Sequence, residues 1–283
     1  VIDTFLQIFT MQTIIIRQPD DWHVHLRDGE ALKHTVAATA AHCHRALVMP
    51  NLKPALTSAK ALAQYRERIL KARPEGSEFI PYMTYYLNEA VDPNEFSTAA
   101  KNHILGAKLY PAGATTNSDE GARSLTALYP ALEVMQDCGL VLQIHGEVTH
   151  GDIFEREALF LSEYLAPIIK AFPKLRIVLE HISTRAAVDF ITEAPEHVAA
   201  TITPHHLLYN RNQLLAGGIR PHYYCLPILK HADCQLALRQ AIASGNPKFF
   251  AGTDSAPHAV HTKETACGCA GIYSAPYAVA LYA

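Results

Sequence analysis

The sequence predicts a (β/α)8 barrel, a cylinder of eight parallel strands surrounded by helices. Short β-branched or apolar runs alternate with longer segments of helical, 3.6-residue periodicity, and this alternation favours a parallel sheet. Eight such runs occur within about 250 residues, which is the strand count and length of this fold. No low-complexity linker and no internal repeat divides the chain. The expected strands are residues 13–16, 46–49, 79–86, 106–109, 141–145, 176–180, 199–203 and 249–252.

The segments between these runs carry the expected helices. In residues 59–72, for example, Leu62, Tyr65 and Ile69 fall on one helical face. The other expected helices are residues 125–137, 153–171, 184–193 and 234–244.

Composition excludes several classes of protein. The chain has 283 residues, 49% of them hydrophobic, and a net charge of −3, which disfavours a nucleic-acid surface. No window approaches the roughly 18 uninterrupted apolar residues of a membrane span. The six scattered cysteines are expected to be reduced, in the cytoplasm, and the lone Cys267-Gly-Cys269 is a weak zinc signal.

The first ten residues, VIDTFLQIFT, do not resemble a signal peptide, because they lack a basic start and a small-residue cleavage site. Met11 follows directly. We therefore expect residues 1–10 to be an extension and residues 11–283 to form a single barrel domain.

Polar side chains gather where the expected strands end. In the stretch DWHVHLRDG, His23, His25 and Arg27 are two residues apart and would share one face of an extended chain. The carboxyl ends of all strands open onto one face of such a barrel, so distant residues would converge there. The strand-end residues are His23, His25, Asn51, Lys108, His145, His181, Thr203, His205, His206, Asp254 and His258.

Part of this set suits a metal centre. His and Asp are common zinc ligands, and four histidines with one Asp are more than one open catalytic zinc needs. They suit two metals. An ammonium at Lys108 would be repelled by such cations, whereas a carbamate formed from its amine and CO2 could bridge them. Taken singly, each histidine has an ordinary core or surface role, Lys108 is a snorkelling lysine, and Asp254 is a helix N-cap.

Together, several motifs resemble the dihydroorotase family, in particular its monofunctional bacterial and fungal type within the amidohydrolase superfamily. H-x-H alone indicates only the superfamily, whereas KLYPAGATTNS and RPHYYCLPILK are more specific to the family. The motifs are DWHVHLRDG, VMPNL, IHGEVTH, LEHIST, TITPHHL, GTDSAPH, KLYPAGATTNS and RPHYYCLPILK.

The resemblance implies a metal-dependent hydrolase barrel with a binuclear zinc centre. It implies that Lys108, as N6-carboxylysine, and a hydroxide bridge two Zn²⁺ per subunit, although cobalt or manganese would also fit such ligands. The implied metal ligands are His23, His25, Lys108, His145, His181 and Asp254, with Asp254 also the catalytic base. The implied substrate-binding residues are Arg27, Asn51, Thr115, Thr116, Leu226, His258 and Ala270, of which Leu226 and Ala270 act through their backbone.

The implied reaction is the reversible closure of N-carbamoyl-L-aspartate to L-dihydroorotate with loss of water, the third step of pyrimidine synthesis. A homodimer is also implied, with no nucleic-acid or membrane partner. Family members carry more chain after the last strand than SAPYAVALYA provides, so we expect an incomplete eighth helix. Two alternatives stay open: another cyclic-amide hydrolase, such as a hydantoinase or allantoinase, and a chain that is inactive or serves as a scaffold.

Overall fold

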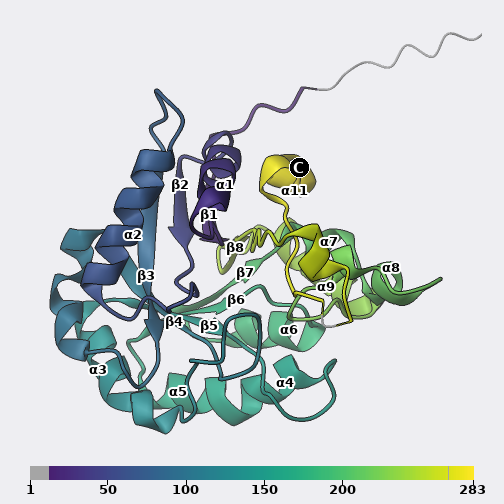
Figure 1. Ribbon diagram of the computed structural model, residues 1–283. Coiled ribbons are helices and arrows are strands. Elements are labelled where there is room, and N and C mark those ends of the chain that lie inside the picture. Colours follow the sequence, from purple (N-terminus) through teal and green to yellow (C-terminus); the bar gives the residue numbers. More distant parts are fainter. Residues whose placement is uncertain (1–12, 267) are drawn as a thin grey trace, which may run out of the picture.

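The sheet is a barrel of parallel strands in chain order (Figure 1). The computed structural model describes residues 13–266 and 268–283. Between the first and last strands, Val24 bridges Ser255, and the amide of His25 donates to the Ser255 carbonyl at 3.1 Å. The strands within the described ranges are β1 (Asp20–Val24), β2 (Arg45–Val48), β3 (Ile80–Leu87), β4 (Ile104–Leu109), β5 (Val141–His145), β6 (Arg176–Glu180), β7 (Val198–Ile202) and β8 (Phe249–Ala251).

Helices connect the strands and cover the outside of the barrel (Figure 1). Those that precede β7 are α1 (Glu30–Ala40), α2 (Ala59–Ala72), η1 (Pro93–Asn102), η2 (Thr126–Leu128), α3 (Tyr129–Cys138), α4 (Arg156–Phe160), the π-helical η3 (Leu161–Leu165), α5 (Ala166–Ala171) and α6 (Arg185–Glu193). Those that follow it are α7 (Pro204–Leu208), α8 (Arg211–Leu215), η4 (Pro221–Tyr223), α9 (Ala232–Ala243), α10 (Val260–Lys263), η5 (Ala275–Tyr277) and α11 (Ala278–Tyr282).

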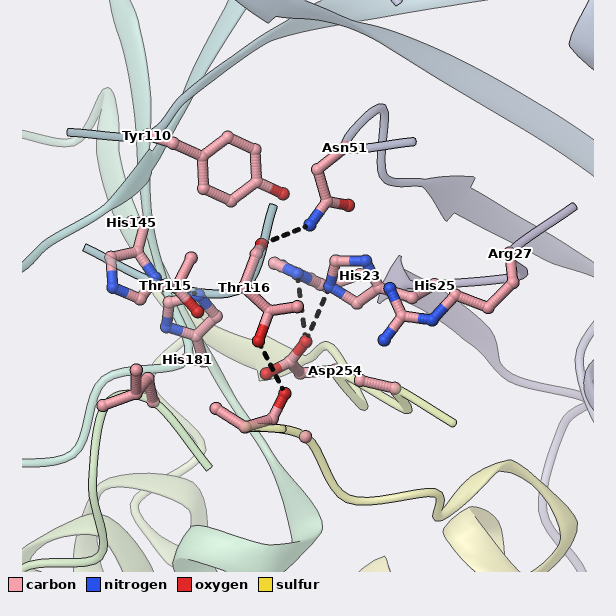
Figure 2. A pocket seen from close by; sticks show the side chains of 14 residues that line it. His23, His25, Arg27, Asn51, Tyr110, Thr115, Thr116, His145, His181 and Asp254 are labelled. Atoms are coloured by element: carbon pink, nitrogen blue, oxygen red, sulfur yellow. Dashed lines mark hydrogen bonds and ion pairs between the residues drawn. The ribbon is translucent and has the colours of Figure 1, made fainter. Parts of the chain in front are cut away.

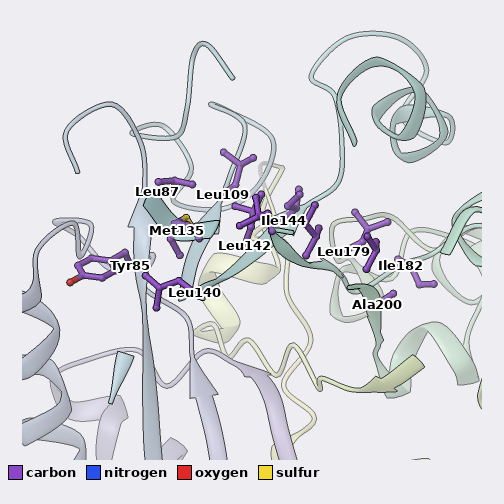
Figure 3. Close-up of a cluster of buried hydrophobic side chains, with 14 of the residues drawn as sticks. Tyr85, Leu87, Leu109, Met135, Leu140, Leu142, Ile144, Leu179, Ile182 and Ala200 are labelled. Carbon is purple, nitrogen blue, oxygen red and sulfur yellow. The ribbon is translucent and has the colours of Figure 1, made fainter. Parts of the chain in front are cut away.

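The main core lies between the strands and the outer helices. On β5, Leu142 and Ile144 are fully buried and belong to the same apolar cluster as Met135 of α3 (Figure 3). The alternate residue Gln143 faces inward and accepts a hydrogen bond from Thr84 of β3. Because side chains alternate along a strand, His145 also faces the interior, at the carboxyl end of β5.

The expected first strand at residues 13–16 is wrong. The first strand is β1, and Ile14, Ile15 and Ile16 are 53–92% exposed despite their β-branched side chains. Residues 20–24 have partners on both sides: Asp20 pairs with Arg45 of β2, and the Asp21 carboxylate accepts hydrogen bonds from Thr253 after β8. Pairing and burial therefore outweigh local propensity here.

The other seven expected strands are confirmed, with shifts of one or two residues at their ends. Helix α2 has the expected bounds, whereas the expected helix at 153–171 begins at Arg156 and contains the π-helical turn η3. Helix α1 was not expected, because its buried face includes Thr35 and Thr39 and so blurs the apolar pattern. The proposed extension, residues 1–10, lies outside the described residues.

Among the described helices, none combines the length and the apolar character that crossing a membrane would require.

We predict that Leu142→Ala lowers the free energy of unfolding by about 2–5 kcal/mol, because it opens a cavity in a fully packed layer. Urea unfolding followed by circular dichroism measures the effect. Leu236→Ala on α9 is the control: Leu236 is 49% exposed, and its truncation should cost less than about 0.5 kcal/mol. Equal losses in both variants would contradict the assignment of the core.

Candidate metal centre

A cavity at the carboxyl ends of the strands gathers most of the residues that the sequence singled out (Figure 2). His23 and His145 are the strand residues nearest to it, while His25, His181 and Asp254 follow β1, β6 and β8. The sequence-predicted residues that line it are His23, His25, Arg27, Asn51, Thr115, Thr116, His145, His181, Leu226, Asp254 and Ala270. Lys108 and His258 are not in the lining, but each contacts or acts on residues that are.

His23, His25 and Asp254 form one buried donor group. Nε2 of His25 lies 3.0 Å from Oδ1 of Asp254, and Nε2 of His23 lies 3.4 Å from the same oxygen. One ligand atom from each residue falls within 4.8 Å of the others. Burial lowers the pKa of His25 to about 4. Burial alone would raise the pKa of Asp254, but its hydrogen bonds with His23 and His25 hold it well below its usual range.

The orientation of His23 fits a cation at this group. Its Nδ1 lies 2.9 Å from the buried carboxylate of Glu180, to which it donates. If the ring is neutral, its Nε2 lone pair faces the Asp254 carboxylate, whereas the protonated ring donates from Nε2 to Asp254. The carboxylates of Glu180 and Asp254, one at each nitrogen, therefore favour a positive charge here, from a second ring proton or from a bound cation.

His145 and His181 form a second pair of possible metal ligands. Nε2 of His145 lies 2.9 Å from Glu147, so Nδ1 is left as the acceptor, 3.3 Å from Nε2 of His181. Burial lowers the pKa of His181 well below its ordinary value. The ring centroids of His23 and His181 are 5.1 Å apart, which joins the two donor groups into one site.

Lys108 of β4 lies inside this cluster. Its side chain is fully buried, and Nζ has no hydrogen-bond partner among the described residues. Burial lowers its pKa to about 8, against the attraction of Glu180 and Asp254. Its charge also acts on His23 and His181. A free ammonium here is poorly compensated, so the position suits an amine that has been converted into a metal-binding group.

Two buried glutamates that the sequence reasoning missed orient these histidines. Glu180 precedes His181 in LEHIS, and Glu147 is two residues after His145 in IHGE. Each glutamate accepts a hydrogen bond from an imidazole N–H. This contact fixes the orientation of the ring, so that its other nitrogen faces the site. In the sequence, the only indication of these roles is a glutamate within two residues of a strand-end histidine. Ordinary surface glutamates occur at the same spacing, so this indication is weak.

Three site residues have strained backbones. Arg27, His181 and Asp254 have φ angles of 58°, 43° and 45°, in the left-handed region that non-glycine residues rarely adopt. Such conformations cost about 1–3 kcal/mol each and cluster at functional sites. At Arg27 the strain ends the strand-like alternation that DWHVHLRDG suggested, yet the side chain still reaches the cavity.

On one side of the cavity, Arg27 and His258 form an anion-binding corner. Arg27 donates through Nε to the Pro257 carbonyl, and its Nη2 lies 3.0 Å from Nε2 of His258. Burial and the charge of Arg27 lower the pKa of His258 to about 4, so His258 is neutral at neutral pH. The guanidinium has no carboxylate partner among the described residues, which leaves its charge available to a ligand.

A loop at residues 111–122 covers the cavity. Asn51 donates through Nδ2 to the Thr116 carbonyl at 3.3 Å, and the Thr116 hydroxyl donates to the Ala270 carbonyl at 3.2 Å (Figure 2). With Thr115 and Thr116 in this position, the free volume of the cavity is about 20 Å³, room for about one water molecule. A ring-shaped ligand therefore requires the loop to move.

Of the other strand-end residues, Thr203 and His206 have structural contacts, whereas the ring nitrogens of His205 have no hydrogen-bond partner among the described residues. The Thr203 hydroxyl caps α7, and His206 bonds to Thr203 and to the Pro227 carbonyl. His205 does not line the cavity. Cys267 lies outside the described residues, and Cys269 belongs to neither donor group.

We predict that Glu180→Gln weakens metal binding by about 10–100-fold, since it removes the carboxylate that orients His23. Competition with a chromogenic chelator measures the affinity. Glu163→Gln is a matched control because Glu163 pairs with His150 on the surface, and it should leave the affinity unchanged. Equal affinity in Glu180→Gln and the unmodified chain would contradict this role.

Comparison with known proteins places this geometry in a family. A family model described as amidohydrolase matches residues 9–244. A dihydroorotase of Shewanella halifaxensis is 56% identical over 275 residues, which are 96% of this chain and 80% of that protein.

Two crystal structures resemble the chain as a whole. Dihydroorotase from Campylobacter jejuni has a TM-score of 0.86 and 37% identity, covering 94% of this chain and 75% of that one. Dihydroorotase from Saccharomyces cerevisiae, solved with 5-fluoroorotic acid, has a TM-score of 0.86 and 34% identity, covering 93% and 76%. The chain therefore belongs to the amidohydrolase family and, within it, to the dihydroorotases.

Proposed function

We propose that this chain is a metal-dependent dihydroorotase that interconverts N-carbamoyl-L-aspartate and L-dihydroorotate. The observation that carries the proposal is one cavity in which a metal-ligand set adjoins an anion-binding corner. The first part suits hydrolysis of an amide, and Arg27 suits the substrate carboxylate because its planar fork can bind both oxygens. Family membership supplies the identity of the ring.

The proposed metals are two Zn²⁺ ions. His23, His25 and Asp254 would hold one, His145 and His181 would hold the other, and Lys108 would contribute to both. Bound there, the metals would polarise the amide carbonyl and lower the pKa of a water molecule toward about 7. The carboxylates of Glu180 and Asp254 at the two nitrogens of His23 favour a positive charge there and support this assignment.

The proposed modification of Lys108 follows from its environment. Because burial lowers its pKa to about 8, a fraction of the side chain is a neutral amine near neutral pH. That amine attacks CO2, a nitrogen–carbon bond forms, and the nitrogen loses a proton. The product, N6-carboxylysine, carries a negative charge where the unmodified ammonium would repel the metals.

Asp254 is the proposed proton carrier. In the hydrolytic direction, water adds to the ring carbonyl next to the amide nitrogen, and Asp254 accepts the proton that the water loses. As the carbon–nitrogen bond breaks, Asp254 gives this proton to the leaving nitrogen. Its low pKa keeps Asp254 ionised and able to accept the proton.

Arg27, Asn51 and His258 are proposed to hold the substrate carboxylate, while backbone groups at Leu226 and Ala270 bind the ring amides. Residues 111–122 would withdraw to admit the ring, and Thr115 and Thr116 would then contact its edge. The place of the reaction in pyrimidine synthesis and the homodimer remain predictions that follow from the family resemblance. The cytoplasmic location remains a prediction from the six scattered cysteines.

Assay of the zinc-loaded chain with two substrates tests the function. We expect hydrolysis of L-dihydroorotate and little hydrolysis of hydantoin, which has no carboxylate for Arg27 to bind. Arg27→Ala should raise KM for dihydroorotate by about 30-fold or more, the effect of losing about 2 kcal/mol of charge-assisted binding. Its zinc content should not change. Activity on hydantoin alone would exclude the proposed substrate, and zinc loss in Arg27→Ala would show that Arg27 supports the metals instead.

Lys108→Ala and Asp254→Ala should each abolish turnover, for different reasons. The first should lose bound metal and recover part of its activity when a short carboxylic acid is added, because the acid can replace the carbamate. The second removes both a proposed ligand of one metal and the proton acceptor, so added acid should not restore its activity. Steady-state assays with and without the acid distinguish the two variants. Substantial activity of purified Lys108→Ala without added acid would contradict the proposed role of Lys108.

A further inference from the structure

Lys263, the last residue of α10, has a buried ammonium outside the proposed catalytic groups. Its side chain is 4% exposed. Nζ donates to the carbonyls of Tyr224, Cys269 and Gly271 at 2.9, 2.8 and 2.7 Å. An ammonium has three N–H donors, so each of them has a carbonyl partner. A buried charge that is held only by backbone carbonyls fixes those carbonyls in place, because losing the contact would leave the charge uncompensated.

The carbonyls of Cys269 and Gly271 both point toward Lys263. The Ala270 carbonyl between them points away from Lys263: it accepts from the Thr116 hydroxyl at 3.2 Å and lies 3.0 Å from Nε2 of His258. Thr116, one of these partners, lines the cavity together with Ala270. With its two neighbours held on Lys263, the Ala270 carbonyl is directed toward the cavity.

The same bonds act on the Ala270 amide. The Cys269 carbonyl and the Ala270 N–H belong to one peptide unit, and a trans peptide places them on opposite sides. The N–H therefore points away from Lys263. Hydrogen bonding of the Cys269 carbonyl to a cation also polarises this peptide and makes its N–H a stronger donor.

The third bond connects this segment to the other backbone element of the cavity. The Tyr224 carbonyl accepts from Lys263 and also from the Gly271 amide at 2.9 Å. Leu226, two residues later, lines the cavity together with Ala270. Position 271 has no room for a side chain, since a Cβ there would lie 2.8 Å from the Ala256 carbonyl oxygen.

We propose that Lys263 is a positioning residue for substrate recognition: it holds residues 224–226 and 269–271 so that their backbone groups match the amide edge of a cyclic ureide. This inference rests on the proposed function, which supplies the ring. Lys263 does not touch the substrate, and none of its carbonyl partners is a proposed metal ligand.

The main test compares ligand binding by zinc-loaded Lys263→Met with that of the unmodified chain. We expect the Kd for 5-fluoroorotic acid and the KM for dihydroorotate to rise about tenfold or more, because a small displacement of positioning groups is costly. The kcat should change by less than about threefold, since the reacting groups keep their places. The zinc content should stay the same.

Lys230→Met is the matched control. Lys230 is also 4% exposed and donates from Nζ to a backbone carbonyl, that of Ile228, but it does not bond to residues 269–271. Lys230→Met should lower the stability of the fold, because it removes a buried lysine, yet leave the Kd for 5-fluoroorotic acid within about twofold.

Lys263→Arg keeps the positive charge, but a planar guanidinium cannot direct three N–H groups from one atom. It should raise the Kd about threefold or more, and it provides a second variant if Lys263→Met does not fold.

Hydrogen exchange tests the positioning without any ligand. In Lys263→Met, the amides of Cys269 and Gly271, which donate to Thr262 and Tyr224, should exchange at least about tenfold faster, while amides of β5 keep their rates. Unchanged exchange in residues 269–271, or unchanged affinity with faster exchange, would overturn the proposal. Failure of the unmodified chain to bind 5-fluoroorotic acid would instead count against the proposed function, because the exchange measurement does not depend on it.

Discussion

The buried amine of Lys108 is the constraint on which the site depends. A fully buried nitrogen with no hydrogen-bond partner among the described residues, surrounded by imidazoles, would cost free energy as an ammonium. Around it, Glu180 and Glu147 use the outer nitrogens of His23 and His145, which leaves the inner nitrogens directed at the site. In the neutral rings these inner nitrogens are lone pairs that can bind a metal. Cations satisfy this arrangement, and a negatively charged lysine derivative balances them.

The barrel makes this arrangement possible, because it brings together residues that are far apart in the chain. His23 and Asp254 are 231 positions apart in numbering, yet the amide of Asp254 donates to the carbonyl of His23 at 2.8 Å. The strained backbone of His181 directly follows β6, and that of Asp254 is three residues after β8. The rigid strands compensate for the cost of these conformations, which direct the side chains into the cavity.

Much of this could be predicted from the sequence. Strand–helix alternation gave the barrel, and polar residues at strand ends gave the donor set, since both depend on periodicity. The run at residues 13–16 misled because β-branched residues favour a strand only when a neighbouring strand is available. Helix α1 was missed because Thr35 and Thr39 occupy its buried face, where they bond to backbone carbonyls.

Glu147, Glu180 and Lys263 could not be assigned from sequence, because their roles depend on what lies beside them in space. Glu180 meets a histidine 157 positions away, and Lys263 meets the Tyr224 carbonyl 39 positions away. Neither spacing forms a motif. The types of residue are also ordinary on protein surfaces, so only burial distinguishes these three from solvated charges.

The threonines of residues 111–122 have a consequence for inhibitors. In the arrangement described, Thr115 and Thr116 line a cavity with room for about one water molecule, so a ring enters only after side chains such as these shift. The apparent affinity of any such compound is its intrinsic affinity multiplied by the fraction of molecules in which the threonines have withdrawn. A compound that itself donates a hydrogen bond to the Ala270 carbonyl, in place of the Thr116 hydroxyl, would recover part of this lost affinity.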